Sequence, residues 1–287
     1  MFQGFDNSIP NAVIHEELVV CQNSLHTWGR ANQVLFDPAK ESHHILHPKR
    51  FSGDNFRLLG VTFDPQLSMK TACYEIAAIA STRLRALLRT RHFHSRASLV
   101  LQFKSQVLSG IDFATPAIYH APRFYVGVID RVQEEFCEAI GVSKLEALLE
   151  YNLPPLSSRR DMSGLSLIHR VVLGIAPPQF SKLLYPAHEH YLQRGWAFRI
   201  SRHSKQLHDP LSNPSSRMMK RSIFSLVYPY NNLPQYVVNS STIKSFQRHL
   251  HHALKKCAEA EPNNWETLFR NSVYTRSVRQ FRAWFEP

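Results

Sequence analysis

The aspartates of this 287-residue chain are scattered singly along the sequence. Two-metal nucleotidyl transfer needs clustered carboxylates that hold two Mg²⁺ ions about 4 Å apart, and magnesium takes several oxygen ligands. No Asp-Asp pair occurs, since the aspartates are Asp6, Asp37, Asp54, Asp64, Asp112, Asp130, Asp161 and Asp209. The sequence therefore predicts no catalytic carboxylate pair and no metal cofactor for this chain.

The sequence also lacks the residue patterns of zinc sites, of nucleophilic serines and of phosphate-binding loops. Clustered histidines occur at His43-His44, His92-x-His94 and His249-x-His251-His252. No cysteine or carboxylate stands at zinc-ligand spacing around them, so we interpret them as surface or helix-face histidines. Ser157-Ser158 lies outside any G-x-S-x-G motif, and no glycine-rich phosphate loop occurs.

Basic residues gather between positions 71 and 110, where the single acidic residue is Glu75. Six basic residues lie there: Arg83, Arg85, Arg89, Arg91, Arg96 and Lys104. Because they are interleaved with apolar positions, they predict a basic helix edge that follows phosphates, with arginine making bidentate contacts. The open alternative is a solvated helical face without a ligand.

Two further arginine-rich segments each have two interpretations. Arg159 and Arg160 precede Asp161 at a predicted helix start, where we favour capping and ion pairing over a ligand role. Near the C-terminus, aromatic rings mixed with arginines could stack bases, although such a tail more often packs on the body of the protein or is disordered. The residues of this tail are Trp265, Phe269, Phe281, Trp284 and Phe285, with Arg270, Arg276, Arg279 and Arg282.

Apolar spacing predicts the elements that position these residues. A helix that ends near Gly29 is predicted by a core-facing stripe of Ile14, Leu18, Cys21, Leu25 and Trp28. Short β-prone runs follow at 33–36, 43–47 and 56–63, separated by turn residues. Together these segments predict a small α+β unit.

From about Met69 the periodicity is helical only. Four helices are predicted by four stripes: Met69, Cys73, Ile76, Ala80, Leu84 and Leu87; Leu99, Phe103 and Val107; Val128, Val132, Phe136 and Ile140; and Met162, Leu165, Ile168 and Val172. Pro116 and Pro122 are expected to break the run and Pro177-Pro178 to end it. Beyond Tyr185 the sequence is irregular until one more helix, from Thr242 to about Ala258.

The positive charge of the chain is distributed unevenly. The formal net charge is +12, and residues 186–287 contribute most of it, with 15 basic and 6 acidic residues. This excess favours a polyanionic partner, of which nucleic acid is the commonest. No apolar run near 18 residues and no secretory signal pattern occurs. We therefore expect no membrane partner and an intracellular location, nuclear or cytoplasmic, with reduced cysteines; the sequence implies no oligomeric state.

Four segments carry a family resemblance. WGRANQVLFDPAK (28–40) and FRLLGVTFD (56–64) resemble the region after the catalytic loop of non-LTR (LINE-type, jockey-like) retrotransposon reverse transcriptases. LEALLEYNLPPLSSRRD (145–161) and LGIAPP (173–178) resemble the helical region downstream in that family. The resemblance extends over residues 1 to about 270.

The resemblance implies a role for each region. Residues 1–68 would be a distal palm remnant, 69–185 a helical thumb-like domain, and 186–287 a basic, partly irregular C-terminal extension with one helix. Lys40 falls at the palm lysine of the family, and Leu58, Leu59 and Gly60 fall at the primer-grip turn. The fingers and the Ala-Asp-Asp loop, which binds Mg²⁺ in the parent enzyme, would precede residue 1.

We therefore expect a mainly α protein with a small α+β palm remnant, a helical thumb-like domain and an irregular basic C-terminal region. The expected function is that of a C-terminal fragment of an RNA-directed DNA polymerase that is inactive alone and binds RNA and DNA without sequence preference. The alternative is a domesticated nucleic-acid-binding or scaffolding protein without catalysis.

Overall fold

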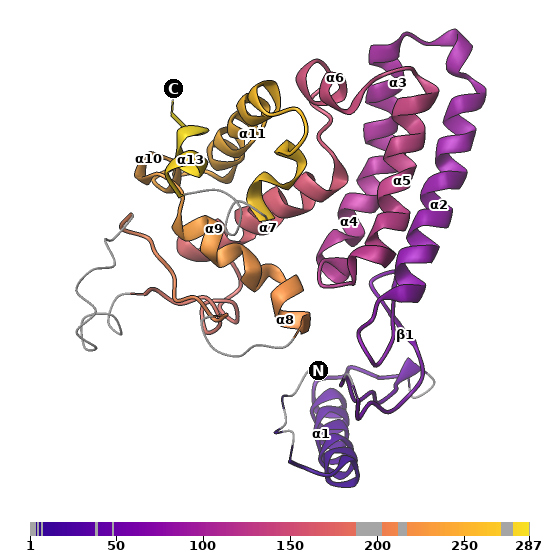
Figure 1. The fold of residues 1–287 in the computed structure, drawn as a ribbon. Coiled ribbons are helices and arrows are strands. Elements are labelled where there is room, and N and C mark those ends of the chain that lie inside the picture. Colours follow the sequence, from indigo (N-terminus) through magenta and orange to yellow (C-terminus); the bar gives the residue numbers. More distant parts are fainter. Residues whose placement is uncertain are drawn as a thin grey trace. The chain divides into compact units, whose positions relative to one another are not determined.

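The computed structural model describes residues 4, 6, 8–37, 40–47, 49–187, 203–211, 217–270 and 278–286. These residues are mainly helical, with one small two-stranded sheet near the N-terminus, which confirms the predicted fold class (Figure 1). The chain divides into two compact units, Met1–Ala72 and Cys73–Pro287. The division lies four residues after the boundary we predicted at 68. Our second boundary, at 185, has no counterpart, because one hydrophobic cluster contains residues from both sides of it.

The N-terminal unit contains a helix and a β-hairpin. Helix α1 spans Asn11–Ala31, and strands β1 (Phe56–Leu58) and β2 (Val61–Phe63) pair antiparallel. Leu59 and Gly60 form the turn, with φ angles of 49° and 82°. Positive φ at both positions matches the twist of a tight hairpin, and only glycine adopts it without strain.

The other two predicted strand runs are wrong within the described residues. Run 33–36 has no strand, and run 43–47 contributes one isolated bridge, between Ile45 and Ser52. A β-prone run becomes a strand only where a neighbouring strand supplies hydrogen bonds and packing. The hairpin has such a partner within the same eight residues. Run 33–36 has none among the described residues, and run 43–47 pairs only through Ile45.

The apolar stripe of α1 is also less buried than we predicted. Only Ile14 of its five residues is buried, and Trp28 is 55% exposed. The unit has few apolar residues that could cover the stripe, since its other buried hydrophobics are Ile45, Val61, Met69 and Ala72. The apolar spacing therefore predicted the helix correctly, but the prediction that its stripe faces a core was wrong.

The first helices of the second unit pack through the predicted stripes. They are α2 (Lys70–Arg89), α3 (Arg96–Phe103), α4 (Ser109–Ile118) and α5 (Arg123–Ala139), with a short 3₁₀ turn, η2 (Arg91–Phe93), after α2. A π-helical segment, η3 (Lys104–Leu108), joins α3 to α4. Phe103 of α3 stacks on Phe136 of α5 with ring centroids 4.1 Å apart.

Pro116 does not break the chain where we expected. It lies inside α4, which continues to Ile118. Proline in the last turn removes one backbone hydrogen bond, and the buried Ile111, Ala114 and Ile118 hold the helix together around it. The break comes afterwards, before Pro122.

The rest of the second unit is built on α7. The helices are α6 (Lys144–Leu149), α7 (Leu156–Val172), α8 (Arg217–Arg221), α9 (Val227–Asn231), α10 (Gln235–Val238), α11 (Ile243–Ala260) and α13 (Val278–Ala283), with 3₁₀ turns η4 (Ile223–Leu226) and η5 (Trp265–Thr267). Helix α7 contacts both α5 and α11, so it links the first helices to the C-terminal ones (Figure 1). Gly164 of α7 permits close packing, because an added Cβ would lie 2.5 Å from Leu226.

The C-terminal region is more ordered than our prediction of one helix. Helix α11 agrees with that prediction, but α8, α9, α10 and α13 were missed. The reason is that short apolar runs such as 226–238 show no helical period, yet Leu226, Tyr230 and Val237 are completely buried. The parts of the irregular stretch at 188–202 and 212–216 lie outside the described residues.

Candidate nucleic-acid interface

The predicted basic residues of α2 point in different directions. Arg85 and Arg89 are exposed, four residues apart, on the side of α2 away from the buried Leu84 and Leu87. Arg83 instead turns toward η3, where its Nη1 donates to the carbonyl oxygen of Gln106 at 3.1 Å. Arg85 and Arg89 therefore face solvent, whereas Arg83 supports helix packing.

The other three predicted basic residues also lie in different surroundings. Arg91 is exposed in η2. The Arg96 guanidinium lies 3.9 Å from Glu146, and Lys104 is half-buried, with its Nζ donating to the carbonyl oxygen of Tyr151. The six residues consequently form no single edge. Three of them (Arg85, Arg89 and Arg91) are exposed and form no ion pair within the described parts of the chain.

Lys104 belongs to a second basic group around the loop that follows α6. Lys255 of α11 donates to the carbonyl oxygen of Leu149 at 3.0 Å, and His251 Nε2 lies 3.3 Å from Asn152 Oδ1. Burial lowers the pKa of Lys104, and the nearby charges of Arg159 and Lys255 lower it further. Residues far apart in the sequence thus place their positive charges around one loop.

This second group was missed by the sequence analysis. Arg159 was interpreted as an ion-pairing residue, His251 as a helix-face histidine, and Lys255 was not singled out. Its signal was nevertheless present, because His251 and Lys255 are four residues apart and so share a helix face. The contribution of Lys104 and Arg159 depends on tertiary packing, which no local spacing reveals.

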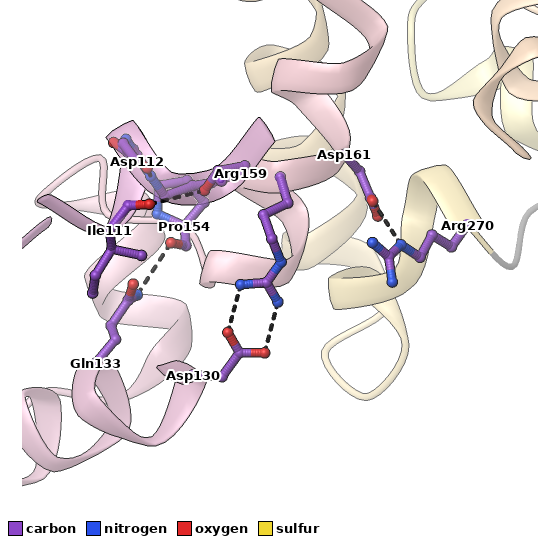
Figure 2. A network of polar contacts seen from close by, with 10 residues as sticks. Ile111, Asp112, Asp130, Gln133, Pro154, Arg159, Asp161 and Arg270 are labelled. Carbon is purple, nitrogen blue, oxygen red and sulfur yellow. Dashed lines mark hydrogen bonds and ion pairs between the residues drawn. The ribbon is translucent and has the colours of Figure 1, made fainter. Parts of the chain in front are cut away.

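The ion-pairing part of the interpretation of Arg159 and Arg160 is confirmed (Figure 2). The capping part is wrong, because α7 begins after Pro155 with no side-chain cap hydrogen bond. Arg159 pairs with Asp112 of α4, and Arg160 makes two hydrogen bonds of 2.7 Å to Asp130 of α5. The next residue, Asp161, accepts a 2.6 Å hydrogen bond from Arg270 Nε. Three successive residues of α7 therefore connect it to three different segments.

Asp161 is the most deeply buried of these charges. Its side chain is 1% exposed and also accepts a hydrogen bond from the Tyr119 hydroxyl at 2.9 Å. Burial raises the pKa of Tyr119, and the Asp161 carboxylate raises it further, so the hydroxyl keeps its proton and donates. Asp161, Tyr119 and Arg270 satisfy one another's hydrogen bonds, so this buried contact has a structural role.

A cavity of about 320 Å³ is lined by residues of α5, α6, α7 and η5. Its lining contains the carboxylates of Asp130, Glu134, Glu138 and Glu266 and one ammonium group, from Lys144. The Lys144 Nζ already lies 3.0 Å from Glu134 and 3.3 Å from Glu266. Excess negative charge makes this cavity unsuitable for a polyanion.

The residues assigned by resemblance lie in the N-terminal unit. The Lys40 side chain is 83% exposed, and its Nζ lies 3.4 Å from Asp37. Leu58, Leu59 and Gly60 lie at the end of the hairpin, with Leu59 81% exposed. Among the residues that the structure describes, no group of three His, Cys, Asp or Glu side chains is placed to hold a metal ion.

The aromatic residues near the C-terminus pack on the body of the protein, as the commoner interpretation predicted. Trp265, Phe269, Phe281 and Phe285 are at most 3% exposed and belong to the large hydrophobic cluster. Their faces are covered, so they do not offer stacking surfaces to bases. Arg276 lies outside the described residues. None of the described helices combines the length and apolar character needed to cross a membrane.

No family model, curated protein or solved structure matches this chain. The resemblance to non-LTR reverse transcriptases therefore stands on the four sequence segments that carry it, and its functional content is a proposal.

Proposed function

We propose that this chain corresponds to the distal palm and thumb-like region of a non-LTR RNA-directed DNA polymerase. It binds RNA and DNA without sequence preference and does not polymerise by itself. Lys40 would be the palm lysine and Leu58, Leu59 and Gly60 the primer-grip turn, while Mg²⁺ would be held by the aspartate loop of the parent enzyme. No Asp-Asp pair in this sequence could replace that loop.

One observation carries the binding part of the proposal. Arg85, Arg89 and Arg91 are exposed and form no ion pair within the described residues, in a chain with a net charge of +12. An exposed arginine without a carboxylate partner keeps its hydrogen-bond donors available for phosphate oxygens. Binding of this kind releases counterions and therefore weakens as salt concentration rises.

The test measures the affinity of the purified chain for a single-stranded oligonucleotide at several salt concentrations. Wild type should bind DNA and RNA of unrelated sequence with similar affinity. Replacing Arg85, Arg89 and Arg91 by Gln should flatten the slope of log K against log salt by about 2, at roughly 0.7 per lost phosphate contact.

A charge-matched control replaces Arg123, Arg131 and Arg170, which are also exposed but are spread over α5 and α7 instead of grouped within seven residues. It should change the slope much less. The binding proposal fails if wild type does not bind, or if affinity does not depend on salt. The polymerase part has its own assay, because dNTP incorporation with Mg²⁺ or Mn²⁺ should stay at background.

A further inference from the structure

Helix α11 carries a stripe of basic residues on one side. Lys244, Arg248, His251 and Lys255 are spaced four, three and four residues apart, so they lie on one face of a helix with 3.6 residues per turn. Another face holds the buried core residues of the helix, such as Leu250 and Cys257. Eleven residues at 1.5 Å each give the stripe a length of about 16 Å.

The stripe contains no carboxylate. The first acidic residue of α11 is Glu259, one turn beyond Lys255. Lys244 and Arg248 are exposed, and His251 and Lys255 are half-buried. The stripe thus runs from open solvent toward the loop that follows α6.

Two cations from other elements extend the stripe at its half-buried end. His251 lies beside the same loop as Lys104 and Lys255, with its Nε2 3.3 Å from Asn152 Oδ1. Burial lowers the pKa of His251, and the charges of Lys255, Arg159 and Lys104 lower it further. Asp112, the ion-pair partner of Arg159, is the acidic side chain bonded to this group.

The two lysines also have a structural role at the C-terminal end of α6, because Lys255 donates to the carbonyl oxygen of its last residue, Leu149, and Lys104 to that of Tyr151. An ammonium group has three donors, and one hydrogen bond from each is described. Donors therefore remain on both Lys104 and Lys255. Lys104 is also the first residue of the π-helical segment, a geometry that recurs at functional sites.

We propose that Lys244, Arg248, His251 and Lys255 of α11, together with Lys104 and Arg159, bind the phosphate backbone of one nucleic-acid strand. We call these six residues the α11 track. Phosphates supply the negative charge that this linear group of cations lacks, and the length of the stripe fits several consecutive phosphates. The inference rests on the proposed function for its ligand, and it adds a contact on α11 to that of Arg85, Arg89 and Arg91.

The test uses the full chain and a 20-nucleotide single strand. The track variant replaces Lys244, Arg248 and His251 by Gln and leaves Lys104 and Lys255, which support α6, unchanged. Removing two permanent cations should flatten the slope of log K against log salt by about 1.4. An unchanged melting curve establishes that the variant is folded.

The Arg85, Arg89 and Arg91 variant is the comparison. If it flattens the slope and the track variant does not, the inference is overturned and the proposed function stands. If wild type does not bind, the proposed function itself fails and the inference fails with it. If the track variant loses binding to phosphatidylserine vesicles but not to the oligonucleotide, the track recognises anionic lipid and the inference is overturned.

The protonation of His251 supplies a readout that a structural role would not change. Lys104, Arg159 and Lys255 disfavour its charged form, Asp112 is paired to Arg159, and Glu150 of the same loop is exposed. Bound phosphate would raise the pKa of His251, so oligonucleotide affinity should increase severalfold as pH falls from about 7.5 to about 6. His251→Gln should reduce this increase, and an identical pH dependence in wild type and variant would contradict the track.

Discussion

The two units of this chain bury their apolar residues very differently. In the N-terminal unit, α1 has a clear apolar stripe, but two of its residues are exposed, Leu25 by 36% and Trp28 by 55%. In the second unit, one hydrophobic cluster extends from Leu148 to Phe285 and includes completely buried side chains such as Tyr230 and Phe246. Regular spacing of apolar residues therefore predicts a helix in both units, but a core only where other elements cover the stripe.

The charged residues differ in the same way. Lys40 and Asp37 form an exposed pair in a turn of the first unit, where solvent screening leaves little stabilisation. In the second unit, Arg160 is 5% exposed and makes a two-bond pair with Asp130. The second unit thus combines a large core with fixed internal ion pairs, and its remaining exposed cations are available for a ligand.

The largest expected effect compares one aromatic side chain from each unit. Phe246→Ala should destabilise the second unit by about 3–5 kcal/mol, because it leaves a cavity in a closed core. Trp28→Ala should cost less than about 1 kcal/mol, since most of that side chain is already exposed. Urea unfolding followed by circular dichroism measures both.

Phe113→Ala is the control within the second unit, because Phe113 is 68% exposed. It should cost less than about 0.5 kcal/mol, which separates the effect of burial from that of the unit. If Trp28→Ala destabilises the protein as much as Phe246→Ala does, the claim that only the second unit has a closed core is wrong.

A smaller effect should appear when pH is lowered. His169 is completely buried, with Nε2 2.9 Å from the Ser240 carbonyl oxygen and Nδ1 3.0 Å from the Tyr230 hydroxyl. A neutral ring satisfies both contacts, since Nε2–H donates to the carbonyl and Nδ1 accepts from the hydroxyl. Burial lowers the pKa of His169 and likewise that of His203.

The sign of the pH effect follows from these shifts. A folded-state pKa below the unfolded value of about 6.5 means that the unfolded chain binds more protons. The stabilisation is therefore complete above pH ~6.5 and is lost as pH falls below it. The free energy of unfolding should fall between about pH 7.5 and pH 5.5, and less steeply in His169→Gln/His203→Gln than in His92→Gln, whose histidine is exposed. Equal pH slopes in the two variants would contradict the assignment.

The sequence predicted the helices of the second unit well because their stripes are long and regular. In the stripe of Val128, Val132, Phe136 and Ile140 the last three residues are buried as expected, and Val128 is half-buried. Short elements such as α9 and α10 were missed, because four or five residues are too few to show a helical period. Packing against distant residues stabilises them, and Val227 and Val238 are both completely buried.

The candidate site was predictable only in part, for a related reason. The exposure of Arg85 and Arg89 on the same face could be predicted, because they are four residues apart on one helix. The grouping of Lys104 and Arg159 with α11 depends on how three separate elements pack around the Leu149–Leu153 loop. Sequence spacing reports neighbours within one helix and says nothing of contacts between residues about 150 positions apart.

Lysine footprinting tests most directly the claim that the second unit, through α11, is where nucleic acid binds. The full chain is treated with an amine-acylating reagent with and without a saturating single-stranded oligonucleotide, and the modified peptides are quantified by mass spectrometry. We predict that Lys244 and Lys255 lose reactivity severalfold on binding, while the exposed Lys49 of the first unit, which has no proposed role, reacts equally in both samples. Protection of Lys49 with unchanged reactivity of Lys244 and Lys255 would contradict the account.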